Sequence, residues 1–175
     1  MKKKTINLRE ASFTQAINIS AKWCKEWGEE LLSEEVLADR IAELIKTKNG
    51  LRGFFAYALS DKDCLLLDKL PYSLIFKLNE SGDSVVNIVV KNLIMSAAQI
   101  IIHQRENNHE YEITSENISD RCKAILRLLK TNSVAKSVNQ ALRDLDDMGN
   151  SFDDSVKYDS EQKEFIKKQI LDIDQ

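Results

Sequence analysis

Five polar side chains between residues 92 and 106 recur at intervals of three or four, the spacing of one helix face. They are Asn92, Ser96, Gln99, His103 and Glu106. At 100° per residue they fall within about 40° either side of one line, so their side chains could converge on a ligand. Arg105 adds a guanidinium that binds anions in a bidentate manner. A pocket here would therefore hold an anionic small ligand through Arg105 and His103.

The same line has two other interpretations. It could be the narrow solvated face of an otherwise buried helix, which is the usual role of such a line, or a contact with a second copy or another protein. His103 and Glu106, three residues apart, could also hydrogen-bond and hold the imidazole in one tautomer. These residues are thus candidates for a ligand site or an interface.

Trp23 and Trp27, four residues apart, form a second candidate surface. Together with Phe54, Phe55 and Tyr57 they could present an aromatic docking surface, because exposed Trp and Tyr are typical interface anchors. At this spacing aromatic residues more often belong to the core.

Motifs for metal binding and catalysis are incomplete. Glu106-x-x-His109 has the spacing used by di-iron bundles, but they need a second such motif, and the other histidine is His103. The acidic run from Asp144 resembles a calcium loop, but Ser155 stands where the loop needs a glutamate. There is no G-x-S-x-G motif, no phosphate-binding glycine loop and no C-x-x-C pair. We expect no metal and no cofactor, and the sequence favours a non-enzymatic protein without deciding it.

Composition limits the fold and the compartment. Five glycines and one proline in 175 residues argue against a many-turned β-sandwich or barrel, and the length fits one domain. Three cysteines, Cys24, Cys64 and Cys122, are sparse and odd in number, which is typical of a reducing compartment. The residues after the basic start lack the apolar run of a signal peptide. We expect a cytoplasmic protein.

The charge distribution argues against nucleic acid as a partner. Residues 1–143 carry a net charge of +3 and residues 144–175 a net charge of −6. Lys123, Arg127 and Lys130 share a helix face, but residues 115–148 hold six basic and five acidic side chains. Such a balance attracts phosphates weakly.

Apolar stripes with a helical period predict a chain of helices joined by short connections. Asn7 and Ser33 are expected to cap the first two, Asn49-Gly50 to end the second, and Ser133 and Asp159 to cap the last two. The expected helices span about 8–32, 34–48, 51–59, 71–79, 83–107, 115–130 (capped by Thr114 or Ser115), 133–147 and a last segment after Asp159.

The segment from Asp83 to about residue 107 is the most informative. Its β-branched start, Val85 to Val90, could form a buried strand, but about 24 residues without Gly or Pro favour a helix. A helix that is apolar around most of its circumference is typical of the centre of a bundle. Its apolar stretch, Val85–Ile102, is too polar for a comfortable membrane span, so we expect no membrane.

Residues Lys91–Ala98 followed by His103-Gln104-Arg105 resemble a stretch from an uncharacterised family of small soluble all-α proteins of photosynthetic bacteria. The similarity extends through Arg52–Phe55 and the helix after Ser115, covering roughly residues 50–170. The family offers no activity to transfer. The resemblance adds weight to five positions for testing: Asn92, Met95, Ser96, His103 and Arg105.

The sequence predicts an all-α single domain over residues 1–175, a bundle around the buried helix at about 83–107, with an acidic C-terminal helical segment from residue 144. The predicted function is that of a non-enzymatic interaction or regulatory protein, homodimeric or bound to another protein. The alternative is a helical small-ligand-binding module or enzyme with an anion-accepting pocket near His103 and Arg105.

Overall fold

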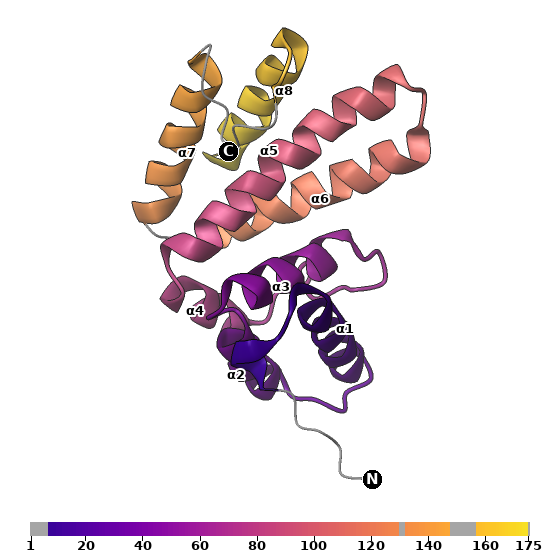
Figure 1. Cartoon of the computed structure of the whole chain (residues 1–175), viewed down its shortest axis with the longest axis vertical. Coiled ribbons are helices and arrows are strands. Elements are labelled where there is room, and N and C mark those ends of the chain that lie inside the picture. Colours follow the sequence, from indigo (N-terminus) through magenta and orange to yellow (C-terminus); the bar gives the residue numbers. More distant parts are fainter. Residues whose placement is uncertain (1–6, 130–131, 148–156, 175) are drawn as a thin grey trace. The chain divides into compact units, whose positions relative to one another are not determined.

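A computed structural model describes residues 7–129, 132–147 and 157–174, and these residues form helices, turns and loops without a strand. The predicted all-α fold is confirmed. The chain divides into two compact units, Met1–Ser81 and Gly82–Gln175 (Figure 1). That residues 1–175 form a single domain stays a prediction. Residues 148–156 of the predicted acidic segment lie outside the described residues.

The N-terminal unit consists of two packed helix pairs, α1 with α3 and α2 with α4. Its elements are η1 (Leu8–Glu10), α1 (Phe13–Gly28), α2 (Glu34–Leu44), α3 (Lys48–Ser60) and α4 (Tyr72–Glu80). The expected helix from residue 8 is thus split: Asn7 caps a short 3-10 turn, and Ser12 caps α1. The Ser12 hydroxyl accepts the Gln15 N–H, and the Gln15 side chain accepts the Ser12 N–H, so a capping box starts α1.

Gly53 lets α1 and α3 approach closely. A Cβ atom at this position would lie 2.5 Å from the Cβ of Ala16 and 3.0 Å from the carbonyl oxygen of Phe13. Phe54 and Phe55 follow on α3, fully buried, with their rings edge to face at a centroid distance of 5.0 Å. The α1–α3 contact therefore depends on the smallest residue being at this point of α3.

The predicted end of the second helix at Asn49-Gly50 was wrong. Helix α2 ends at Leu44, and Gly50 lies in the first turn of α3, where Thr47 is the N-cap and accepts the Gly50 N–H. A Cβ on Gly50 would lie 1.8 Å from the carbonyl oxygen of Leu44. Glycine here allows the tight α2–α3 connection rather than stopping a helix.

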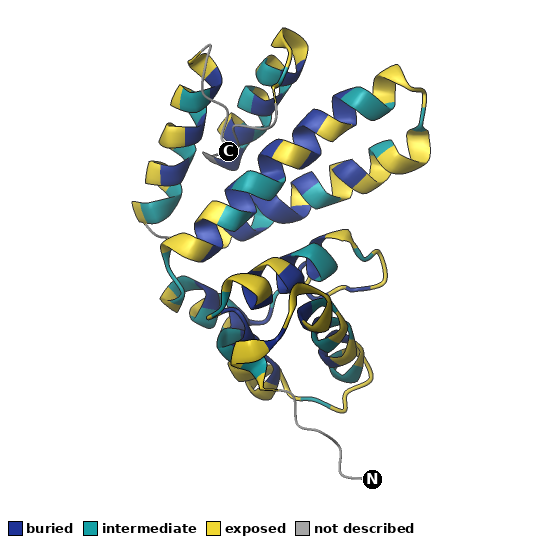
Figure 2. Ribbon diagram, viewed as in Figure 1, coloured by how far each residue is buried: buried dark blue, intermediate teal, exposed yellow. Residues whose placement is uncertain are grey.

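The C-terminal unit is organised around α5, which contacts α6, α7 and α8. Its elements are α5 (Asp83–Arg105), α6 (His109–Leu128), α7 (Asn132–Asp146), α8 (Ser160–Leu171) and η2 (Asp172–Asp174). Figure 2 shows much of α5 in the dark blue of buried residues, and residues 85–90 are helical. The predicted central helix is confirmed, and the strand alternative is excluded.

Two predicted caps in this unit were wrong and one was right. Helix α6 begins at His109, with Asn108 as its cap, rather than at residue 115. Ser133 lies inside α7, where its hydroxyl donates to the carboxylate of Asp83. Asp159 does cap α8, in a capping box with Gln162.

Helix α5 is long and apolar enough to cross a membrane by length and composition, but 61 % of its apolar window is buried inside the protein. A core helix of this kind passes the same test, so the absence of a membrane partner stays a prediction.

Candidate functional site

The first two residues of the predicted polar line are engaged within α5. The amide Nδ2 of Asn92 donates to the carbonyl oxygen of Ile88 at 2.8 Å, and the hydroxyl of Ser96 donates to the Leu93 carbonyl at 3.1 Å. Ser96 is buried, whereas Gln99 is exposed. The line is therefore not one continuous solvated face.

His103 lies half-buried near the end of α5. Its Nδ1 is buried and has no hydrogen-bond partner among the described residues, since the nearest Glu106 carboxylate oxygen is 4.0 Å away. Its ring packs against Tyr111 of α6 at a centroid distance of 5.6 Å. Glu106 is exposed. The predicted His103–Glu106 hydrogen bond thus does not form at this distance.

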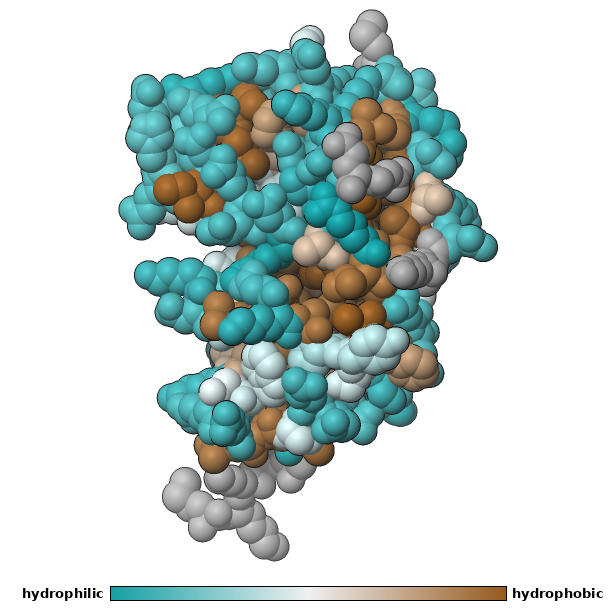
Figure 3. Space-filling view, turned by 180° about the vertical axis from the view of Figure 1, so that it is seen from behind, coloured by the Kyte–Doolittle hydropathy of each residue, from teal (hydrophilic) through white to brown (hydrophobic). Residues whose placement is uncertain are grey.

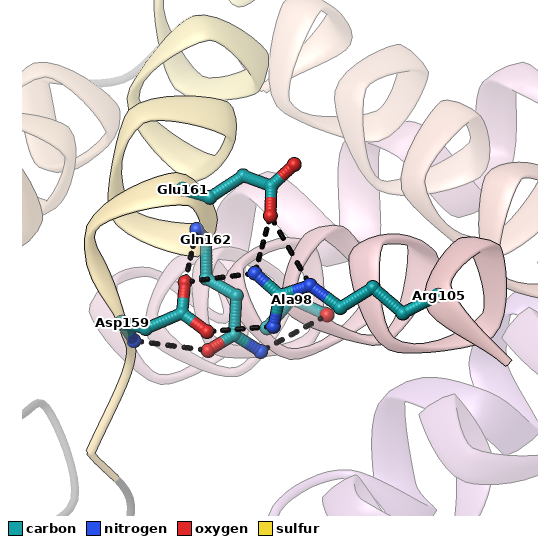
Figure 4. Close-up of polar contacts among 5 residues, drawn as sticks. All are labelled: Ala98, Arg105, Asp159, Glu161 and Gln162. Atoms are coloured by element: carbon teal, nitrogen blue, oxygen red, sulfur yellow. Dashed lines mark hydrogen bonds and ion pairs between the residues drawn. The ribbon is translucent and has the colours of Figure 1, made fainter.

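Arg105 ties α5 to the N-terminus of α8 (Figure 4). Its guanidinium donates from Nη1 to Asp159 Oδ2 at 2.7 Å and from Nη2 to Asp159 Oδ1 at 3.2 Å. Its Nε and Nη2 also bind one carboxylate oxygen of Glu161, the Nε bond being 3.1 Å long. Two carboxylates therefore share the single positive charge of Arg105.

The ion pairs of Arg105 with Asp159 and Glu161, together with Gln162, form a clamp between α5 and α8. Gln162 lies on its buried side. It shares the capping box with Asp159, and its amide Nε2 donates to the carbonyl oxygen of Ala98 on α5 at 3.3 Å. Hydrogen bonding to Arg105, and then to the backbone of Gln162, lowers the pKa of Asp159 from its ordinary 3.8 to about 2. The same pairing raises the pKa of Arg105. Both groups remain charged at neutral pH.

A pocket of about 350 Å³ lies between α5 and the start of α8. Its walls combine apolar side chains of α5 with amides and two cations: Met95, Ala98, Gln99, Ile102, Arg105, Lys157, Tyr158 and Gln162. Gln99 and Arg105 of the predicted site line it, and His103 and Glu106 do not. An anion entering this pocket would have to compete with Asp159 and Glu161 for Arg105.

A larger pocket, of about 830 Å³, lies within the N-terminal unit. Helices α1 and α3, the start of α2 and the segment after α3 all contribute to it. Its lining includes two thiols, two aromatic rings and three leucines: Cys24, Cys64, Trp27, Tyr57, Leu32, Leu65 and Leu66. Trp27 was predicted as part of an aromatic surface, and the structure places it on the wall of this pocket.

The rim of the larger pocket is mainly acidic. Glu30, Glu34, Asp61 and Asp63 line it together with Lys25 and Lys69, which leaves an excess of two negative charges. Lys25 also pairs with Glu29 outside the lining at 3.8 Å. The carboxylate of Asp61 accepts the backbone N–H groups of Asp63 and Cys64 at 2.8 and 3.1 Å, which fixes the segment after α3.

Two titratable groups of this pocket, the Cys24 thiol and the Tyr57 hydroxyl, are held neutral. Hydrogen bonding to Cys64, followed by burial, raises the pKa of the Cys24 thiol far above its ordinary value. Burial first, and then the neighbouring Cys64 and Asp61, raises the pKa of Tyr57. The negative forms of both groups are disfavoured because they would be poorly hydrated and close to other negative charge.

Trp23, the other predicted interface candidate, is 9 % exposed, with the guanidinium of Arg40 at 5.8 Å from its ring. It belongs to the buried side of α1. Among the described residues no group of three or more His, Cys, Asp or Glu side chains could hold a metal ion.

Sequence reasoning missed the meeting of Cys24, Tyr57 and Cys64. The two cysteines are forty residues apart and match no C-x-x-C motif, so their spacing predicted no pairing. The available signal was indirect: Gly53, which allows α1 to approach α3, lies four residues before Tyr57. Only the helix pairing brings these side chains together.

Comparison with known proteins returns a family without an assigned activity. A family model described as uncharacterised conserved protein UCP020893 matches residues 12–173. No curated protein and no solved structure matches the chain. The predicted resemblance to an uncharacterised family is confirmed, and its origin in photosynthetic bacteria stays a prediction.

Proposed function

We propose that this chain, which belongs to the UCP020893 family of uncharacterised conserved proteins, is a non-enzymatic helical protein that binds a small organic cation in the pocket of its N-terminal unit. The observation that carries the proposal is the pocket itself: about 830 Å³, lined by aromatic side chains and by four carboxylates against two lysines.

Size and lining support a small molecule. Ligand pockets are commonly ~300–1,000 Å³, mostly apolar, with a few placed polar groups. Trp27 and Tyr57 contribute aromatic rings to the lining, and leucines and the two buried cysteines lie in the same lining. Such walls favour a ligand with an apolar body.

Charge supports a cation. The faces of Trp and Tyr rings attract cations, and the rim adds four carboxylates against two lysines. Glu30, Glu34 and Asp63 take part in no ion pair among the described residues, so their charge is available to a ligand. An anion would meet this rim with repulsion.

The predicted anion site near His103 and Arg105 stays the alternative. It is supported by the pocket between α5 and α8, and weakened by the two carboxylates already bound to Arg105.

A role as an interaction or regulatory protein, self-associating or bound to another protein, also remains part of the proposal, as does a cytoplasmic location. Exposed apolar side chains support a partner contact: Tyr72 and Phe76 of α4 are 85 % and 57 % exposed. Figure 3 shows hydrophobic side chains at the surface of the face it presents.

Sedimentation at two protein concentrations, with and without a His103→Ala substitution, tests self-association. A protein that stays monomeric in all four samples would rule self-association out.

Calorimetric titration with choline tests the cation site, because choline combines a quaternary ammonium with an apolar surface. We expect choline to bind more tightly than its uncharged isostere, in which carbon replaces the ammonium nitrogen. A cation–π contact contributes about 0.5–2 kcal/mol, so Trp27→Ala should weaken choline binding roughly 2- to 30-fold.

Tyr72→Ala is the matched control, since Tyr72 is an exposed aromatic residue outside the pocket. It should leave choline binding unchanged. Equal binding of choline and the neutral isostere, no binding of choline, or equal losses in both variants would overturn the proposed function.

A further inference from the structure

The three cysteines of this chain have different surroundings. Cys24 of α1 and Cys64 of the segment after α3 line the same pocket, and the Cys24 thiol hydrogen-bonds to Cys64. They are 7 % and 4 % exposed. Cys122 lies in α6 of the other unit, fully buried. Two thiols therefore share an opening to solvent, and the third does not.

The local structure holds the pair together. Helix α1 packs closely on α3 at Gly53, which places Cys24 against the end of α3. The segment after α3 is then fixed because Asp61 accepts the N–H of Cys64 itself. The approach of the two sulfur atoms thus rests on helix packing and on one side-chain to backbone bond.

We propose that Cys24 and Cys64 form a redox-active dithiol, oxidised to an intramolecular disulfide by a small-molecule disulfide that enters the pocket of the N-terminal unit. A disulfide needs two sulfur atoms in reach of each other and a path for the oxidant. The contact between the thiols supplies the first, and the pocket supplies the second.

The reaction balances as two successive exchanges. One protein thiolate attacks the small disulfide, forming a mixed disulfide and releasing one small thiol. The second protein sulfur then attacks the protein-bound sulfur, so the Cys24–Cys64 bond forms and the second small thiol leaves. Two electrons pass from the protein to the small disulfide, and the two protein protons end on the released thiols.

The neutral state of the Cys24 thiol determines how the rate of disulfide formation depends on pH. Because its pKa is raised, the thiolate is scarce at neutral pH, and oxidation should be slow there and accelerate as the pH rises. Such a pair stays reduced in a reducing compartment and responds only to a sustained oxidising change. Transient disulfides of this type are the form in which cytosolic disulfides usually occur.

The test uses the full chain incubated with oxidised glutathione at pH 7 and pH 9, then denatured in the presence of an alkylating agent and digested for mass spectrometry. We expect the alkylated thiols to fall from three to one, with a Cys24–Cys64 linked peptide and Cys122 alkylated. The linked peptide should form faster at pH 9. The readout needs no bound cation, so it can succeed where choline binding fails, and the reverse.

Single substitutions make the assignment specific. Cys24→Ser and Cys64→Ser should each stop the linked peptide and leave a mixed disulfide with glutathione on the remaining pocket thiol. Cys122→Ser is the matched control and should oxidise at the wild-type rate. A disulfide that contains Cys122, a link between two chains, or three alkylated thiols after long incubation at pH 9 would overturn the proposal.

Discussion

The pocket of the N-terminal unit and the pocket between α5 and α8 are both large enough for a small ligand, at about 830 and 350 Å³. They differ in what their polar groups already bind. In the C-terminal unit, Arg105 is paired with Asp159 and Glu161, and the side-chain amide of Gln162 donates a hydrogen bond to the backbone of α5. In the N-terminal unit, the Cys24 thiol and the Tyr57 hydroxyl are neutral, and Glu30, Glu34 and Asp63 have no cationic partner among the described residues.

This difference distinguishes charge that stabilises the fold from charge that we propose binds a ligand. An arginine that already has two carboxylates gains little from a third anion, and it fixes a helix in place. Under the proposed function, Glu30, Glu34 and Asp63, which have no cationic partner among the described residues, would instead attract the cation of a ligand. The residues with the strongest charge chemistry in the sequence thus stabilise the fold, and the less conspicuous ones form the better pocket.

The largest effect is expected for Gly53→Ala, which should disturb the packing that forms the N-terminal pocket. The added Cβ would meet Ala16 at 2.5 Å, and overpacking of this kind costs about 1–3 kcal/mol of unfolding free energy, measured by urea denaturation. Because α1 would move away from α3, choline binding and Cys24–Cys64 oxidation should weaken as well.

Gly28→Ala is the control for this change. Gly28 ends α1, and a Cβ there meets nothing within 4 Å, so alanine should leave stability unchanged or raise it by up to about 1 kcal/mol. If Gly53→Ala is as stable as Gly28→Ala and binds choline normally, the close α1–α3 contact does not form the pocket.

The fold was predictable where periodicity and length act together. The breaker-free run from Asp83 predicted α5 and its central place, and the Asp159–Gln162 spacing predicted the start of α8. Helix ends were less predictable because they depend on competing caps. Gly50 was interpreted as a stop, yet its missing side chain serves the turn between α2 and α3.

The candidate site was predictable only in part, for a physical reason. Helical periodicity places residues on a face, but it does not show what lies opposite. Gln99 of the predicted polar line and Arg105, which was predicted for its anion-binding chemistry, both line the α5–α8 pocket. Periodicity could not show that Asp159, fifty-four positions away, would bind Arg105, or that Cys64 would meet Cys24.

Gln162→Ala tests the C-terminal side of the comparison. The substitution removes the side-chain acceptor of the Asp159 N–H and the donor to the Ala98 carbonyl, so we expect a loss of about 1–2 kcal/mol of unfolding free energy. Gln99→Ala is the matched control: Gln99 lines the same pocket but is exposed, and its loss should cost less than about 0.5 kcal/mol. Equal effects would mean that the clamp does not hold α8 on α5.

The smallest effect is a local response of α8 to acid. The pKa of Asp159 is lowered from 3.8 to about 2 in the folded protein, so the unfolded state binds more protons between these values. The stabilisation from Asp159 is therefore complete above about pH 5 and is lost as the pH falls through 4 towards 2. The protection of the α8 amides against exchange, expressed relative to an unstructured peptide at the same pH and followed by NMR, should fall over this interval. Asp159→Asn keeps an N-cap acceptor but has no carboxylate to protonate, so it should remove this pH dependence. Equal protection of the wild-type α8 amides at pH 5 and pH 3 would show that Asp159 does not bind Arg105 in solution, and Glu161 would then be the one carboxylate that competes with an anion for Arg105.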